Sequence, residues 1–375
     1  MKAKSQTARS LRYLVLALIF PLTAVAGERT IGAVYTMTNA FEGNEVLVFN
    51  RDRRGELTPV GAFDTEGLGT SAGLGNQGAV ILDPANRWLF AVNPGSNDVS
   101  VFAVEDDGLT LVDKAPSNGL QPISLTYAHN LLYVLNAGGA VGGSDAISGF
   151  TVDEDGTLTP IPGSTLPLSA DATGPAQIQF NSDGDVLVVT EKGTDLIDTY
   201  TVDSAGIPTG PNVQVSSGVT PFGFAFGKRD ELFVSEAAGG AQGLSSVSSY
   251  ALDDSGLLSV IDPSVGTTET AACWVVVSND GRYAYTTNAG SDTVSGYEIG
   301  FDGSLKLIDR NGRTGRTGRG SAPIDMSLSN DGRNLYTLNS GNSSISVFRV
   351  KRDGDLQRMH ALWDLPVTAN GLAAR

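Results

Sequence analysis

The sequence has very few of the side chains on which most metal and redox sites are built. It contains one cysteine, Cys273, and two histidines in 375 residues. A single cysteine excludes an internal disulfide and a cysteine-based zinc site, and two histidines exclude a histidine-rich metal centre. We therefore expect no metal site and no cofactor. Because no histidine is expected beside Cys273, we interpret it as a small buried residue rather than a thiolate nucleophile.

Basic residues are scarce as well. The chain has 25 lysines and arginines against 41 acidic residues, a formal net charge of −16. Binding to nucleic acid depends largely on the neutralisation of phosphates by basic side chains. The composition therefore excludes a nucleic-acid partner. It leaves a small-molecule partner possible and does not determine the oligomeric state.

Only one long apolar run is present, and it lies near the start of the chain. Residues 1–12 carry four basic residues and no acidic one, residues 13–20 are apolar, and residues 24–26 read Ala-Val-Ala. A basic segment, an apolar segment and a small-residue cleavage site together are typical of a secretory signal peptide. We expect residues 1–26 to be removed and the rest to act in the periplasm or outside the cell. No second run follows, so we expect no membrane contact after cleavage.

Signals for helices are largely missing, whereas signals for strands recur throughout. Glycine is abundant, with 46 residues, and apolar residues alternate with polar ones in steps of two, which is typical of β-strands. One unit of apolar run, Gly-rich loop, alternating strand, Gly-containing turn and last strand recurs seven times, at a mean spacing of about 50 residues. The second strands of these units are predicted at 33–35, 89–92, 132–135, 186–189, 232–234, 283–285 and 335–338.

Four short strands in about 50 residues are the size of one β-propeller blade. We predict an all-β fold, a single seven-bladed β-propeller over residues 27–375 with four-stranded antiparallel blades. Blade 1 begins at its second strand near Ile31 and has no inner strand before it, whereas residues 370–374 resemble the start of an inner strand. We therefore expect the C-terminal strand to complete blade 1 and close the ring, which hides the edges of an open ring.

One position changes its residue type in two adjacent blades. The residue that closes the second strand is Glu191 in blade 4 and Glu236 in blade 5. Asparagine in this position is typical of a turn, but glutamate is a poor turn former. Two carboxylates held close together raise one pKa, which suits general acid–base catalysis, so we name both as candidate catalytic residues. Two solvated carboxylates, with Lys192 paired to Glu191, are the alternative. The other five blades have Asn39, Asn93, Asn136, Asn288 and Asn339.

The candidate substrate-binding residues are expected on the same face of the propeller. There the loops between second and third strands lie beside the entries to the inner strands. The entries of blades 4, 5 and 6 bring Gln177, Phe222 and Trp274 next to the glutamates; Gln177 would orient a carbonyl group, and the two rings would line a pocket. Asn288, in the same column, and Arg316, in a basic loop before blade 7, complete the set. Ordinary strand packing and a solvated loop are the alternatives.

Several segments carry a family resemblance. Residues 278–285 read Ser-Asn-Asp-Gly-Arg-Tyr-Ala-Tyr and residues 329–336 read Ser-Asn-Asp-Gly-Arg-Asn-Leu-Tyr. With the late Gly-x-Leu turns, they resemble the lactonase family of seven-bladed propellers, which includes 6-phosphogluconolactonase-like and carboxymuconate-lactonizing proteins. The resemblance covers the whole chain after residue 26 and looks closest to an exported bacterial branch. Better-known members of this family have an Arg-His pair at the entry to an inner strand, where this sequence has Phe222-Gly223. The resemblance therefore implies a functional role only for the acidic position, Glu236 with Glu191.

Two functions follow from these observations. The first is an exported lactonase-like enzyme that hydrolyses or opens a small lactone or cyclic ester at the channel mouth, with Glu191 and Glu236 as acid and base. The second is a non-catalytic propeller that binds a small molecule, a glycan or a protein on the same face. The sequence does not decide whether the protein is an enzyme. His129 is expected in a turn on the opposite face, which disfavours a Ser-His-Asp mechanism.

Overall fold

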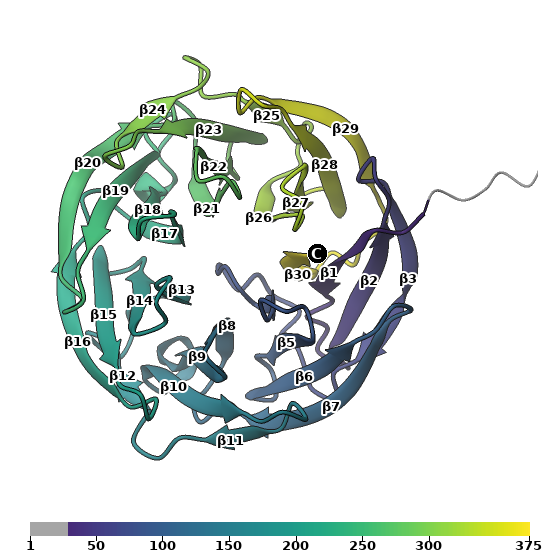
Figure 1. Cartoon of the computed structure of the whole chain (residues 1–375), viewed down its shortest axis with the longest axis vertical. Helices are drawn as coiled ribbons and strands as arrows, with labels where there is room; N and C mark the ends of the chain where they lie inside the picture. The colour runs from purple at the N-terminus through teal and green to yellow at the C-terminus, as the bar shows by residue number, and fades with distance from the viewer. Residues whose placement is uncertain (1–28) are drawn as a thin grey trace, which may run out of the picture.

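The computed structural model describes residues 29–375, which form the predicted ring of seven antiparallel blades (Figure 1). The predicted signal peptide, residues 1–26, lies outside the described residues. In blades 3 and 6 two short strands replace the single outer strand. The helices of the described part are two short 3-10 helices, η1 (Gly138–Val141) and η2 (Ala238–Gly240), and neither is long and apolar enough to cross a membrane.

Each blade runs from an inner strand beside the central channel to an outer strand at the rim. The inner strands of blades 1 to 7 are β30 (Asn370–Ala374), β4 (Val80–Leu82), β8 (Pro122–Ala128), β13 (Pro175–Phe180), β17 (Pro221–Phe226), β21 (Ala272–Val277) and β26 (Pro323–Leu328). The second strands are β1 (Gly32–Met37), β5 (Trp88–Asn93), β9 (Leu131–Ala137), β14 (Val186–Glu191), β18 (Glu231–Glu236), β22 (Tyr283–Asn288) and β27 (Asn334–Asn339).

The outer half of each blade packs on these strands in the same order. The third strands are β2 (Glu45–Arg51), β6 (Asp98–Val104), β10 (Asp145–Val152), β15 (Leu196–Val202), β19 (Ser246–Leu252), β23 (Thr293–Ile299) and β28 (Ser344–Val350). The outer strands are β3 (Leu57–Asp64), β7 (Leu109–Pro116), β11 (Leu158–Pro160) with β12 (Leu166–Pro167), β16 (Pro208–Val215), β20 (Leu258–Gly266), β24 (Leu305–Leu307) with β25 (Gly315–Arg316), and β29 (Leu356–Leu362).

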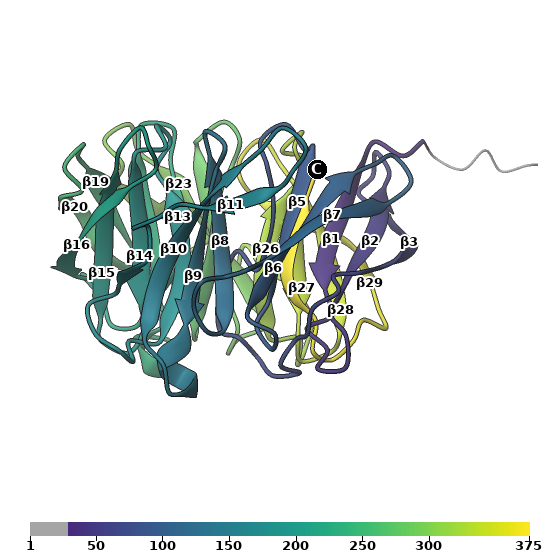
Figure 2. The same cartoon turned by 90° about the horizontal axis from the view of Figure 1, so that it is seen from below.

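The two flat sides of the ring carry different connections (Figure 2). We call one side the loop face; it carries the loops between second and third strands and the links from each outer strand to the next inner strand. The turn face is opposite and carries the tight turns between first and second and between third and fourth strands. In blade 3 the Gly156 N–H donates to the Asp153 carbonyl at 2.9 Å, and Gly156 has a φ of +90°, which glycine adopts without strain.

The ring closes through β30, as predicted. This strand pairs antiparallel with β1, with Ala374 opposite Val34 and Asn370 opposite Met37. Leu372 and Ala374 are buried in an apolar cluster shared with blade 7, and Ala373 is buried in a cluster shared with blade 2. The last strand of the chain therefore completes blade 1 and fills the space between its two neighbours.

Deleting residues 369–375 should lower the melting temperature by many degrees, because the deletion removes the ladder bonds of β30 and exposes the inner surfaces of three blades. Thermal unfolding followed by circular dichroism measures the effect. Val215→Ser, a change at a 77% exposed side chain at the end of the outer strand of blade 4, is the control and should leave the melting temperature unchanged. A truncated chain that melts with the intact one would contradict the closure.

Candidate functional site

We call the seven residues predicted to close the second strands the Asn/Glu column. The column consists of Asn39, Asn93, Asn136, Glu191, Glu236, Asn288 and Asn339. Six of the seven lie at the end of their second strand or one residue before it, as predicted. In five of those blades the column residue is the last residue of the second strand, and in blade 3, where β9 continues to Ala137, it is the last but one. In blades 3 to 7 it lies opposite the start of the inner strand, as in the pair Pro175–Glu191. In blade 1 this place is taken by Met37, and Asn39 lies two residues further on in the loop. The assignment of Asn39 to the column is therefore wrong by two residues, because β1 ends earlier than its Asn suggests.

The asparagines of the column hold the links between blades. In blade 2 the Asn93 amide donates to Ser100 Oγ at 2.8 Å, and Ser100 Oγ donates to the Thr65 carbonyl of the link from blade 1 at 2.7 Å. We call this pair of contacts the Asn–Ser clamp. It recurs with Asn136 and Ser148 in blade 3 and with Asn339 and Ser346 in blade 7, and these side chains are buried.

In blade 4 two acids replace the clamp. Glu191 and Asp198 stand where the sister blades have Asn and Ser, and both are fully buried. The Ser169 N–H, in the link from blade 3, donates to Asp198 Oδ2 at 2.9 Å and to Glu191 Oε1 at 3.1 Å; Ser169 Oγ donates to Glu191 Oε2 at 2.6 Å. Burial, the hydrogen bond to Glu191 and the charge of Glu191 raise the pKa of Asp198 to about 8. This carboxyl therefore keeps its proton at neutral pH.

In blade 5 one acid replaces the asparagine. Glu236 is fully buried and accepts hydrogen bonds from the hydroxyls of Ser246 and Ser248. Gly218, in the link from blade 4, covers it so closely that a Cβ at position 218 would lie 2.2 Å from Glu236 Oε2. Each glutamate is thus enclosed between its own blade and the link that enters that blade. The expectation that both carboxylates face one cavity is wrong, because the column points toward the links between blades rather than into the channel.

The link from blade 1 to blade 2, residues 65–79, crosses the loop-face end of the channel, and we call it the plug. The Asn76 side chain donates to a backbone carbonyl of β8. The Gln77 N–H donates to the Ala176 carbonyl at 3.1 Å, and the Gln77 side chain both donates to the Val275 carbonyl and accepts from the Val275 N–H. The plug is therefore bonded to blades 3, 4 and 6 across the ring.

Phe222, Trp274 and Lys192 gather against the plug. Trp274 is buried and its Nε1 donates to the Asn76 carbonyl; its ring centroid lies 5.0 Å from that of Phe222. Lys192 Nζ lies 4.8 Å from the Phe222 ring and donates to two carbonyls, one in the plug and one in β13. Burial lowers the pKa of Lys192 to about 8. The expectation that the Phe222 and Trp274 rings line a pocket is wrong, because they pack on each other and against the plug. Cys273, beside them, is buried as expected.

The three remaining predicted residues lie apart from this cluster. Gln177 is 5% exposed and joins two inner strands, since its Nε2 donates to the Phe224 carbonyl at 2.9 Å and its Oε1 accepts from the Phe224 N–H at 2.7 Å. Asn288 is buried and donates to a serine hydroxyl of β23. Arg316 is exposed in β25, and nearby Arg313 forms an ion pair with a buried glutamate at 2.6 Å. Within the basic segment, Gly315 and Arg316 pair with β23 and so belong to the outer strand of blade 6 rather than to a free loop.

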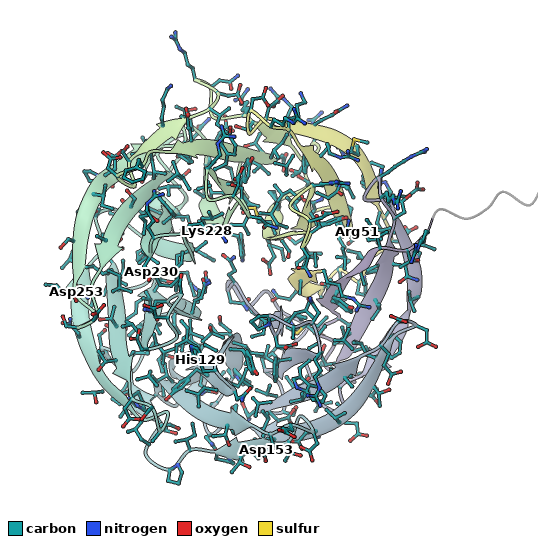
Figure 3. The ribbon with its side chains drawn as sticks, viewed as in Figure 1. Arg51, His129, Asp153, Lys228, Asp230 and Asp253 are labelled. Atoms are coloured by element: carbon teal, nitrogen blue, oxygen red, sulfur yellow. The ribbon has the colours of Figure 1, made fainter. Side chains whose placement is uncertain are left out.

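With the plug across the loop face, the channel is open from the turn face. A chamber of about 410 Å³ lies between the inner strands and reaches the plug at Gln77. A wider mouth of about 710 Å³ adjoins it among the strand turns of blades 3 to 6, where His129 and Lys228 lie (Figure 3). Such volumes are typical of small-molecule sites. Polar side chains on the chamber wall include Thr126, Gln177, Gln179, Asp325 and Ser327.

Asp325 is the acidic group that sequence reasoning missed. It lies in β26 on the chamber wall, is 2% exposed, and its Oδ1 accepts the Met326 N–H at 2.8 Å. Burial raises the pKa of Asp325 well above its usual range, which favours the protonated form of the carboxyl. A register shift between Pro323 and Asp325 marks a bulge, which re-aims side chains in a strand. The sequence did contain a signal for this residue, because Asp325 is the one charged residue in the inner strand Pro323–Leu328.

Among residues 29–375 no three histidine, cysteine, aspartate or glutamate side chains gather closely enough to hold a metal ion. The chamber wall also carries no lysine or arginine. Hydrogen bonding by amides, hydroxyls and the carboxyl groups of Asp83 and Asp325 therefore dominates its chemistry, together with the apolar surface of the strands.

The acid pair of blade 4 should make the protein less stable as pH rises. The pKa of Asp198 is raised in the folded chain from 3.8 to about 8, so the folded state binds the proton more tightly than the unfolded one. Stability is then highest below about pH 4 and falls as pH rises toward 8, by a few kcal/mol at most. Asp198→Asn should flatten this fall, which melting temperatures of both proteins between pH 5 and pH 9 would measure. Parallel pH profiles of the two would contradict the assignment.

Solved structures share the architecture over nearly the full length. A protein from Bacteroides fragilis described as a candidate 6-phosphogluconolactonase superposes with a TM-score of 0.73 at 19% identity, covering 92% of this chain and 98% of its own. A periplasmic gluconolactonase from Pseudomonas aeruginosa gives 0.71 at 18% identity, with 92% and 98% covered. At such identities the likeness establishes the fold alone.

Among curated sequences, an uncharacterised Staphylococcus epidermidis protein is 36% identical over 81 residues, a match that spans 21% of this chain and 23% of that protein. The family profile described as "Lactonase, 7-bladed beta-propeller" matches residues 34–165 and 70–362, which is nearly the whole described chain. Together with the seven blades seen in the structure, this match shows that the chain belongs to the lactonase family of seven-bladed β-propellers.

Proposed function

We propose that this protein hydrolyses a small lactone in the chamber, which the substrate enters from the turn face. The observation that carries the proposal is the buried Asp325 carboxyl on the wall of a chamber of about 410 Å³. Membership of the lactonase family supports the choice of a lactone. The predicted signal peptide supports action outside the cytoplasm, which is also a proposal.

A buried carboxylic acid suits ester hydrolysis because it can both give and take a proton. In the proposed reaction the oxygen of a water bonds to the lactone carbonyl carbon, and the bond from that carbon to the ring oxygen breaks. Asp325 gives its proton to the departing ring oxygen and receives one from the attacking water. One water is consumed, the product is a hydroxy acid, and Asp325 returns to its starting state.

The rest of the wall suits a hydroxylated ring. The amide of Gln179 and the hydroxyls of Thr126 and Ser327 offer donors and acceptors on three different blades. Groups of this kind orient a neutral polar ligand without requiring it to be charged. The chamber therefore also fits the alternative function, a propeller that binds a small molecule without turnover.

Asp325→Asn should lower kcat on a lactone substrate by about 10²–10⁴, the usual worth of a general acid–base, with a smaller change in KM. Asparagine has nearly the same shape, so the melting temperature should change little. Hydrolysis is followed by acid release on a panel of five- and six-membered lactones. Asp254→Asn, the same change at an exposed turn, is the control and should keep full activity. Ligand binding without any turnover would favour the non-catalytic propeller.

Glu191→Asn and Glu236→Asn test the two carboxylates that the sequence singles out. In blade 5 an asparagine at 236 would meet Ser246 and Ser248, the same two positions that Asn339 meets in blade 7. We expect each variant to keep its melting temperature or raise it slightly and to retain lactone hydrolysis within a few-fold. Loss of activity by a hundredfold or more in a variant that still folds would restore these residues as catalytic.

A further inference from the structure

The loop face carries most of the large apolar side chains that the described residues expose. Phe41 is 65% exposed, Leu244 67%, Trp363 53% and Val367 79%, each at the tip of a loop or link. Apolar side chains that together present a large exposed area on one face are typical of an interaction surface. The remaining large apolar side chains exposed in the loops and links of this face are Leu68, Leu120, Val141 and Val219.

Acidic residues gather in the turns of the turn face, on the side opposite to these apolar side chains. The long loops at 138–144 and 237–245 and the links at 117–121 and 216–220 contain no charged residue. The turn face carries acid-rich turns such as 105–108, 153–156 and 253–256. In a chain with a net charge of −16, the loop face is therefore the side on which another acidic surface meets the least repulsion.

We propose that two copies of this chain associate through their loop faces. A stable interface takes about 800 Å² from each partner, and eight large side chains exposed to this extent supply roughly 100 Å² each. A two-fold axis in the plane of contact makes the interface self-complementary. The plug is then covered in both copies, and both turn faces and channel mouths stay open to solvent.

Charges at the edge of the loop face favour a second copy over a lipid surface. On the loop face, each of the two exposed aromatic side chains has an acidic neighbour in the sequence. Glu42 follows Phe41, and Asp364 follows Trp363. An acid next to an inserting ring opposes contact with lipid headgroups and hydrocarbon. The same face has positive charges at Arg316, in β25, and at Arg319, in the link from blade 6 to blade 7. A two-fold axis can bring these arginines close to the acidic residues of the partner.

The mass of the chain in solution tests this proposal. Residues 27–375 are examined by sedimentation velocity and light scattering over a wide range of protein concentration, and we expect a dimer. Phe41→Glu with Leu244→Glu puts two charges into the proposed contact and should weaken the dimer at least about a hundredfold. The matched control, Phe301→Glu with Leu257→Glu, makes the same changes at turn-face side chains that are 89% and 50% exposed, and should leave the dimer intact.

Melting temperatures confirm that both variants are folded before their masses are compared. A wild-type chain that stays monomeric at every concentration would overturn the proposal, as would equal dissociation of the loop-face variant and the control. Co-sedimentation of monomeric wild-type protein with phosphatidylcholine vesicles, lost in the loop-face variant, would also overturn it and assign the face to a bilayer.

Discussion

Ring closure is the constraint on which the rest of this structure depends. A four-stranded blade exposes two apolar faces, and each face is buried only when a neighbouring blade packs against it. The pairing of β30 with β1 makes the first blade whole and lets it meet both neighbours. The channel, the buried column and the position of the plug exist only because the two ends of the chain share one sheet.

Within the closed ring, the plug decides which end of the channel is usable. Asn76 and Gln77 reach blades on different sides of the channel through backbone hydrogen bonds, and Lys192 adds a charged donor from blade 4. These contacts place the plug against Phe222 and Trp274, whose rings pack on each other instead of lining the pocket that the sequence suggested. They also explain why the chamber opens toward the turn face, with Asp325 on its wall.

A departure from a repeat need not mark a catalytic residue. Glu191 and Glu236 break the asparagine pattern, yet both sit in the position that holds an inter-blade link. An asparagine donates to serine hydroxyls there, whereas a carboxylate accepts from them. In blade 5 the hydroxyls of Ser246 and Ser248, at the positions of Ser344 and Ser346 in blade 7, donate to Glu236. In blade 4 Ser169, from the link that precedes the blade, donates to Glu191, and this partner is seen only in the tertiary structure.

The sequence by itself determined the architecture: seven blades, their strand order, and closure by residues 370–374. These features follow from the alternation of apolar and polar residues and from turns that recur in every blade. Because each blade repeats the same local pattern, the wrong assignment of Asn39 to the end of the second strand in blade 1 did not affect the other six. It also placed Gln177, Phe222 and Trp274 correctly on inner strands. Only the tertiary structure decided where side chains point and what fills the channel. The link that crosses the channel depends on contacts between residues as many as 198 positions apart, such as Gln77 with Val275, and no local pattern records them.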